Sequence, residues 1–164
     1  MSDRADAGAV NSPAAVVALN GRLDSELRAL IASVSDADLP RRAGDDEWTV
    51  AQQLGHLGEF PSFFAAQLRA WQADSSTIVG RTHEHAGRLD AVRMSGVSHV
   101  AALQEGADRA LQDLADALAN LADDDCRRKM RNVKYGEELV SAFLDRYVFE
   151  HKRGHIAQLR VTLS

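Results

Sequence analysis

Apolar side chains recur along most of this chain at spacings of three and four residues, which is the period of an amphipathic helix. The first such pattern opens at Ser12 and Pro13, a helix-capping residue followed by proline at the first helical position. One continuous stripe follows on the same face: Val16, Leu19, Leu23, Leu27, Leu30 and Val34. Similar stripes recur further along, so the sequence predicts an all-α fold.

The second predicted helix follows an Asp-rich segment, residues 35–47, which we expect to be a loop. It opens at Thr49, which has the capping-box spacing to Gln52. Pro61 falls on the apolar face and has no N–H to offer to the carbonyl of Leu57, so we expect a kink there. The stripe ends near Ala73 and comprises Val50, Leu54, Leu57, Phe64, Leu68 and Trp71.

The remaining chain predicts two more helices and one long connection. Residues 74–97 form the least regular part, with three glycines, although a short helix near 84–94 fits the sequence. The third helix is predicted over 98–121. A basic loop at 127–134 follows, and the fourth helix is predicted over 136–163. Four long amphipathic helices predict a four-helix bundle.

Two histidines lie on the apolar stripe of the fourth helix, which reads Phe143, Tyr147, His151, His155 and Leu159. Residues four apart share one helix face and are ~6 Å apart along the axis, so both rings can approach one ion. Imidazole is a common ligand of zinc and nickel, and two buried imidazoles without partners would be unfavourable. We favour a metal site, and a hydrogen-bonded pair of core histidines stays the alternative.

His56 is the candidate third ligand, because it lies beside Leu57 on the second helix. Three histidines would leave coordination positions open for water or substrate, as in catalytic sites. His56 lies two turns after the start of its helix and His155 two turns before the end of the fourth. They are level only if these helices are antiparallel, which requires an up-down-down-up bundle with a long crossover. The 24 residues of 74–97 can supply it, since they reach ~80 Å when extended against a bundle of ~37 Å.

Two segments resemble the motifs of the DinB/YfiT-like family of metal-dependent enzymes. Residues 47–57, EWTVAQQLGHL, place a histidine eight positions after Trp48, and residues 149–158, FEHKRGHIAQ, contain HxxxH followed by glutamine. The resemblance extends from residue 13 to the end of the sequence. It implies a homodimeric four-helix bundle with a three-histidine site for zinc or nickel, formed by His56, His151 and His155.

The resemblance also implies a function. Family members include hydrolases and enzymes that use a low-molecular-weight thiol, mycothiol or bacillithiol, as cosubstrate. We therefore expect a metal-dependent enzyme that hydrolyses a small molecule or transfers a thiol sulfur to it, because a bound divalent ion activates water or a thiol. The alternative is a non-catalytic homodimeric metal-binding or stress-response bundle. Nine residues follow His155, so we expect no counterpart of the additional C-terminal domain of mycothiol-dependent maleylpyruvate isomerases.

Two further residues are weaker candidates for catalytic groups. Glu59 lies one turn after His56, and Tyr147 lies one turn before His151. Either could act as an acid or base, or could orient a ligating histidine.

Other reactive side chains are better explained without a catalytic role. His83 and His85 share a side only in extended backbone, so a solvated loop is favoured over a second metal site. The basic segment 127–134 is interpreted as a solvated turn that balances neighbouring aspartates rather than as an anion site. Cys126 adjoins two arginines, which could lower its thiol pKa, but a nucleophilic role is not favoured.

Composition limits the remaining function classes. The chain has 164 residues, a net charge of −5 and one cysteine, which excludes an internal disulfide and a multi-thiolate zinc site. The acidic balance argues against nucleic acid as a partner. No apolar stretch approaches the roughly 20 residues that span a bilayer. Residues 1–12 lack the apolar segment of a signal peptide, so we expect a flexible tail before one domain at 13–164 in a soluble, cytoplasmic protein.

Overall fold

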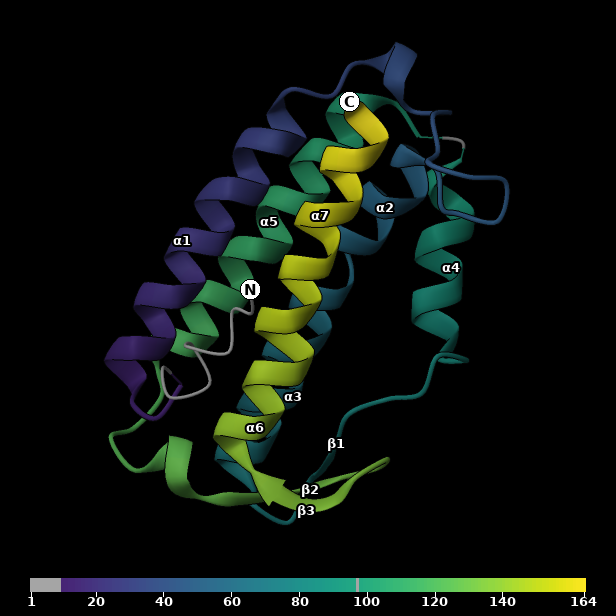
Figure 1. The fold of residues 1–164 in the computed structure, drawn as a ribbon. Helices are drawn as coiled ribbons and strands as arrows, with labels where there is room; N and C mark the ends of the chain where they lie inside the picture. Colours follow the sequence, from purple (N-terminus) through teal and green to yellow (C-terminus); the bar gives the residue numbers. More distant parts are fainter. Residues whose placement is uncertain (1–9, 97) are drawn as a thin grey trace.

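The computed structural model describes residues 10–96 and 98–164, and most of them are helical (Figure 1). Two helices of the bundle are continuous: α1 (Pro13–Ala32) and α5 (Val100–Ala119). The second bundle helix is divided into α2 (Val50–Leu57) and α3 (Phe60–Ala73). The fourth comprises α6 (Val140–Leu144), a π-helical segment (Asp145–Glu150) and α7 (His151–Leu163). Outside the bundle lie α4 (Ala86–Ser95) and a sheet of β1 (Ile78–Val79), β2 (Lys129–Asn132) and β3 (Gly136–Leu139).

The bundle has the up-down-down-up order that the histidine spacing requires. Figure 1 shows α1 and α6–α7 running one way and α2–α3 and α5 running the other. α5 packs against α1, α2 and α3, and α7 packs against α1 and α2. The crossover from α3 to α5 returns along the outside of the bundle, where α4 covers α2.

The helix starts predicted from capping residues are confirmed. Ser12 caps α1 by accepting a hydrogen bond from the Ala15 amide at 3.3 Å. In the capping box of α2 the Gln52 amide donates to Thr49 Oγ1 at 3.2 Å, and the Thr49 amide donates to Gln52 Oε1 at 2.8 Å. The predicted apolar stripes meet in one core, whose fully buried members include Leu27, Leu54, Leu68, Trp71, Leu111 and Phe143.

The second helix breaks near Pro61, where the sequence predicted a kink. α2 ends at Leu57, and Gly58 and Glu59 separate it from α3. Pro61 lies in the first turn of α3, where a missing N–H leaves no helical hydrogen bond unmade. The break places Glu59 directly before the first residue of α3, close to the site described below.

The prediction of an entirely helical chain is wrong in one region. Residues 127–134, expected to be a solvated turn, contain β2, which pairs antiparallel with β3 and parallel with β1 of the crossover. Residues 129–132 alternate between exposed and buried positions, the period of a strand rather than of a loop. Gly136, the predicted start of the fourth helix, has φ +72° and ends the hairpin turn. The fourth helix therefore begins at Val140.

The other connections agree with the sequence prediction where the structure describes them. The short helix expected near 84–94 is α4, and residues 35–47 form a loop with one 3₁₀ turn (Asp36–Asp38). Of the predicted tail, residues 1–9 lie outside the described residues, and Val10 is buried against the core. None of the helices in the described ranges has the length and apolar content needed to span a bilayer.

Candidate metal centre

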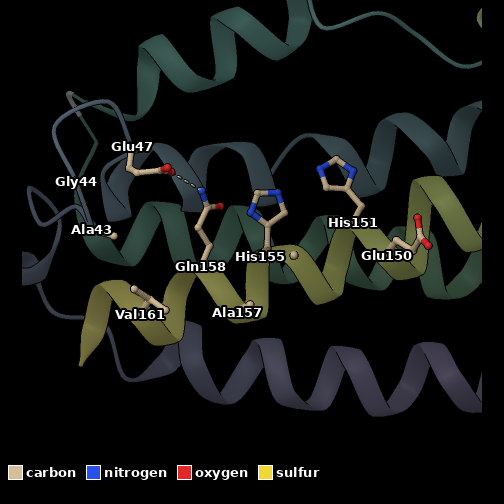
Figure 2. A pocket seen from close by; sticks show the side chains of 10 residues that line it. Ala43, Gly44, Glu47, Glu150, His151, His155, Ala157, Gln158 and Val161 are labelled. Atoms are coloured by element: carbon tan, nitrogen blue, oxygen red, sulfur yellow. Dashed lines mark hydrogen bonds between the residues drawn. The ribbon is translucent and has the colours of Figure 1, made fainter. Parts of the chain in front are cut away.

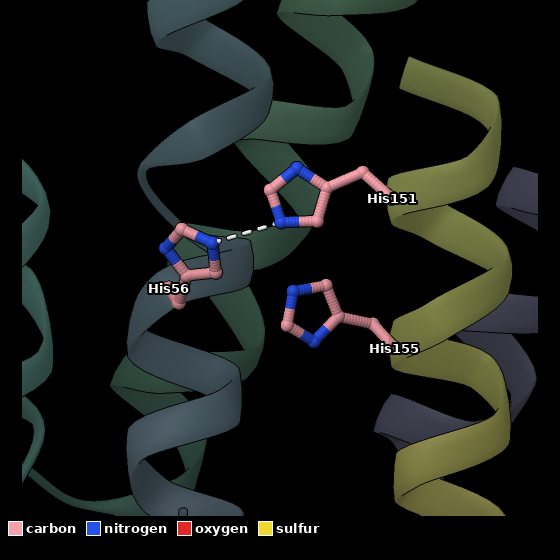
Figure 3. Close-up of side chains that lie close together, drawn as sticks. All are labelled: His56, His151 and His155. Atoms are coloured by element: carbon pink, nitrogen blue, oxygen red, sulfur yellow. Dashed lines mark hydrogen bonds between the residues drawn. The ribbon is translucent and has the colours of Figure 1, made fainter. Parts of the chain in front are cut away.

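Three histidines from two antiparallel helices meet inside the bundle (Figure 3). His56 comes from the last turn of α2, and His151 and His155 come from the first two turns of α7. The Nε2 atoms of His56 and His151 are 3.1 Å apart. The ring centroids are separated by 5.0 to 5.1 Å, and one ring nitrogen from each histidine lies within 4.8 Å of the other two. The structure thus brings together the three side chains that sequence spacing selected.

The separation of these nitrogens fits one shared ion. Two nitrogens that lie at the zinc–imidazole bond length and at the tetrahedral angle are roughly 3.3 Å apart, close to the 3.1 Å between the rings of His56 and His151. Ring nitrogens also suit nickel and copper ions. Within residues 10–96 and 98–164, this is the group of side chains that could hold a metal ion.

Burial keeps the three rings uncharged at neutral pH. The side chains of His56 and His155 lie almost entirely out of solvent. The pKa is lowered from 6.5 to about 2 in His56, to about 3 in His151 and to about 4 in His155, with desolvation as the largest cause. The neighbouring histidines of the cluster and nearby arginines account for the rest of the shift in His56 and His151, and Arg88 does so in His155. The neutral imidazole is the form that coordinates a metal, so these rings need lose no proton to do so.

Aromatic side chains hold the rings in place. Phe60 stacks on His151 with ring centroids 4.1 Å apart and planes 16° from parallel. Trp48 lies edge-on against His56 at 5.2 Å. Phe60 was not predicted as a site residue, because its position depends on the break between α2 and α3.

The π-helical segment directly precedes His151. Residues spaced by four drift by about 40° per step around a regular α-helix. A wider π turn offsets that drift, so Tyr147 faces Phe64 of α3 while His151 and His155 face His56 of α2. The π-helical segment thus keeps Tyr147, His151 and His155 on one side of the helix. The spacing of apolar residues did not predict this segment.

Glu59 lies beside His56 on the outer side of the site. Its Oε2 is 3.7 Å from His56 Nδ1, beyond hydrogen-bond distance, and this buried nitrogen has no hydrogen-bond partner within the described residues. The Glu59 carboxylate accepts hydrogen bonds from both Nη atoms of Arg81: Nη1 donates to Oε1, and Nη2 donates to Oε2 at 2.8 Å. Arg81 thus engages both oxygens of this carboxylate and holds it at that distance from His56. A role for Glu59 in orienting His56 or in proton transfer stays a prediction.

Tyr147 lines a cavity of about 280 Å³ together with His56 and His151. Its hydroxyl lies 3.4 Å from Asn132 Oδ1. A wider groove of about 840 Å³ reaches His151 and His155 along α7 (Figure 2). There Gln158, the glutamine that follows the HxxxH motif, donates to Glu47 at 3.3 Å. The site is therefore open to small molecules on two sides, and a catalytic role for Tyr147 stays a prediction.

The remaining candidates lie elsewhere. In the part of the chain that the structure describes, His83 and His85 belong to no cluster that could hold a metal. His83 is exposed beside the cavity, and His85 is half-buried with its ring edge-on to Phe63 at 4.9 Å. Cys126 is buried, and burial raises the pKa of its thiol. The lowering that its arginine neighbours suggested is therefore wrong.

A buried charged contact beside the site was not predicted. Lys152, the residue after His151, is fully buried, and its Nζ donates to Asn20 and to Asp24 of α1. Asn20 in turn donates to Asp24 at 2.7 Å. Asn20 and Asp24 lie four residues apart on the buried face of α1. Because buried polar groups require partners, these two residues could have predicted a buried polar contact from the sequence alone.

Several solved structures have the same fold as this chain. A mycothiol-dependent maleylpyruvate isomerase matches with a TM-score of 0.72 and 14% identity over 90% of this chain and 60% of that one. The colibactin self-resistance protein ClbS, solved in complex with double-stranded DNA, matches with a TM-score of 0.72 and 13% identity over 94% and 96%. An uncharacterised protein from Clostridium difficile 630 matches with a TM-score of 0.68 and 9% identity over 90% and 93%. Identities this low show a common fold alone, and the chain spans only 60% of the isomerase.

Sequence comparison assigns the family. No curated protein matches the chain in sequence. The sequence profile of the DinB superfamily matches residues 21–159, a range that includes all three histidines of the centre. This match covers most of the chain and agrees with the observed fold, so the chain belongs to the DinB superfamily.

Proposed function

We propose that this protein is a metal-dependent enzyme for a small-molecule substrate, with His56, His151 and His155 as ligands of one divalent ion. The observation that carries the proposal is the convergence of three neutral imidazoles, two of them buried and His151 half-buried, which all line one open cavity of about 320 Å³. Zinc or nickel is the ion we expect, because imidazole suits both. When bound, it would serve as a Lewis acid and activate water or a thiol for attack.

The chain's own residues would position this chemistry. Glu59 would orient the His56 ring once its Oε2, 3.7 Å from Nδ1, approaches to hydrogen-bond distance. Phe60 and Trp48 cover the rings and exclude water from that side. The Tyr147 hydroxyl lines the cavity of about 280 Å³ and is available to hold a proton close to a bound substrate.

Two reaction classes fit this arrangement: hydrolysis, and transfer of sulfur from a low-molecular-weight thiol. The likeness to a structure named as a mycothiol-dependent isomerase supports the second class. Two openings to the histidines, the cavity lined by Tyr147 and the groove along α7, would let a thiol and its acceptor approach from different sides. We further propose that the working protein is a homodimer.

Metal content tests the proposal directly. Protein purified without added metal should contain close to one zinc or nickel per chain, measured by mass spectrometry of the metal. His151→Ala should lose it, because two histidines bind a divalent ion far more weakly than three. His99→Ala is the matched control, since this exposed histidine at the start of α5 lies outside the site.

Loaded protein should then be assayed with simple esters and amides, and with electrophiles plus a thiol such as mycothiol or bacillithiol. Activity that is lost with the metal in His151→Ala and kept with the metal in His99→Ala would support a metal-dependent enzyme. A metal-free protein whose melting temperature is unchanged by a chelator would instead support a non-catalytic bundle.

A further inference from the structure

Positive charge is concentrated in the cavity beside His56 and His151. Four cationic side chains line it, drawn from the crossover, the hairpin turn and the π-helical segment: Arg81, Arg88, Lys134 and Arg146. The whole chain carries a net charge of −5, so the charge of this cluster is opposite in sign to that of the chain. Such a concentration of like charge in a concave site attracts anions.

Two of these cations are already neutralised by carboxylates. Arg81 pairs with Glu59, and Arg146 pairs with Glu138 at 2.6 Å. In both pairs the cation also lies over an aromatic ring, so its position is fixed. These pairs form walls of the cavity.

The other two cations, Arg88 and Lys134, form no salt bridge within the described residues. Arg88 donates to the carbonyl of His83 at 3.0 Å, and its guanidinium lies 5.0 Å from the centre of the Trp48 ring. The Lys134 ammonium lies 5.3 Å from the centre of the Tyr135 ring. The cavity therefore holds two positive charges that form no salt bridge of their own, and Glu59, already paired with Arg81, attracts Arg88 only from a longer distance.

The small sheet fixes where the hairpin cation lies. Asn132 Oδ1 accepts hydrogen bonds from the amides of Lys134 at 2.8 Å and Tyr135 at 3.3 Å, which shapes the turn. The Val133 amide donates to the Val79 carbonyl at 2.8 Å and ties this turn to the crossover. The position of Lys134 at the cavity is thus set by backbone pairing, and not by its long side chain alone.

We propose that this cavity binds a carboxylate or phosphate group of the substrate and directs the rest of that molecule towards the ion held by the three histidines. This inference rests on the proposed function. Guanidinium and ammonium groups are the donors that bind such oxyanions most strongly. The apolar body of the substrate would lie against Phe64, Tyr135 and Tyr147, and a volume of about 280 Å³ limits it to a small molecule.

Calorimetric titration of metal-free protein with two probes, inorganic phosphate and succinate, tests the inference without any need for a bound metal. The double variant Arg88→Gln/Lys134→Gln should weaken binding of the preferred probe by about tenfold or more, since charge-assisted hydrogen bonds are lost. The matched control is Arg93→Gln/Lys129→Gln. It removes the same charge from α4 and from the hairpin at exposed positions, and it should change the affinity by less than about twofold, because exposed charges are screened.

The probe that binds more tightly identifies the oxyanion as a carboxylate or a phosphate. Equal weakening in both double variants, or no binding of either probe to the unmodified protein, would overturn the inference. In nickel-loaded protein the methylene protons of bound succinate should relax faster, and Arg88→Gln/Lys134→Gln should abolish this effect. Oxyanion binding by a protein that takes up no metal would support the cavity and contradict the proposed function, so the two failures are distinguishable.

Discussion

Lys152 follows His151 in the sequence but contacts a different neighbouring helix. Successive residues of a helix are 100° apart, so His151 faces α2 while Lys152 reaches α1. Burial lowers the pKa of the Lys152 ammonium, and Asp24 opposes this shift. α7 is thus held on one side by a buried ion pair and presents the histidines on the other, and the ion pair keeps their backbone in place.

Removal of Asp24 tests how much this contact stabilises the fold. Asp24→Ala leaves the buried ammonium of Lys152 without its carboxylate, so we expect the free energy of unfolding in urea to fall by about 3–5 kcal/mol. Glu105→Ala is the control, because its ion pair with Arg109 is exposed and such pairs contribute little. Similar losses of unfolding free energy in the two variants would show that the buried pair stabilises the fold no more than an exposed pair does.

The histidines themselves predict how stability depends on pH in metal-free protein. Their pKa values, about 2 to 4 in the folded protein, lie below the ordinary 6.5 that we expect in the unfolded chain. The unfolded chain therefore binds more protons below pH 6.5, and stability should fall as the pH falls from 6.5 to 5. Each histidine contributes a slope of up to about 1.4 kcal/mol per pH unit.

Urea unfolding at several pH values measures this slope. His56→Gln should reduce it, because one of the three buried imidazoles is lost. His99→Gln should leave it unchanged, since His99 is exposed and lies outside the histidine cluster. A flat stability profile between pH 6.5 and 5 would contradict neutral, buried rings.

At the scale of elements, the sequence predicted the parts that depend on local patterns. The stripe of α1 and the caps at Ser12 and Thr49 are properties of neighbouring residues, and both are observed. The histidine cluster could be predicted because HxxxH fixes one face of α7 and the long crossover fixes helix direction. The strand β1 could not, because it has two residues and pairs with residues far along the chain, such as Val79 with Asn132. The β2–β3 hairpin is local, but each of its strands has only four residues.

The contact of α4 with α2 depends on a glycine next to His56. A Cβ added at Gly55 would lie 2.5 Å from Ser95 Cβ and 2.8 Å from the Ala91 carbonyl oxygen. Gly55→Ala should therefore push α4 away from α2 and lower the free energy of unfolding by about 1–3 kcal/mol. The displacement would also move Arg88, so oxyanion affinity should fall with stability.

Gly21→Ala provides the matched comparison, because a Cβ at Gly21 in α1 meets no atom within 4 Å. Alanine is the better helix former, so this variant should be more stable by about 0.4–1 kcal/mol. Chemical denaturation of both variants measures the difference. A stabilising Gly55→Ala would show that α4 is loosely held and does not position Arg88.

At the scale of the whole molecule, the candidate site lies where three parts of the chain meet. The bundle supplies the histidines, the crossover supplies Arg81 and Arg88, and the hairpin supplies Lys134. The bundle core is extensive and buried, whereas the sheet is small and lies at one end (Figure 1). Small peripheral units open more easily than a packed core. The cavity should therefore be able to loosen while the histidine cluster stays assembled.

A substitution at Asn132 tests whether the cavity can loosen while the histidine cluster stays assembled. Asn132 is buried, shapes the hairpin turn and donates to Glu138 at 2.7 Å. Asn132→Ala should speed hydrogen exchange of the Val133 amide by about tenfold or more, because hydrogen bonds that hold the turn are lost. Amides of α1 and α5 should exchange as before. Oxyanion binding should weaken although no charge has been removed.

Asn120→Ala is the control for this experiment, since Asn120 is an exposed cap residue that donates to the Asp116 carbonyl at 2.7 Å. It should leave both Val133 exchange and oxyanion affinity unchanged. Faster exchange throughout the bundle in Asn132→Ala would mean that sheet and core unfold as one cooperative unit. The cavity could not then vary independently of the histidines, and the two halves of the site would have to be regarded as a single rigid structure.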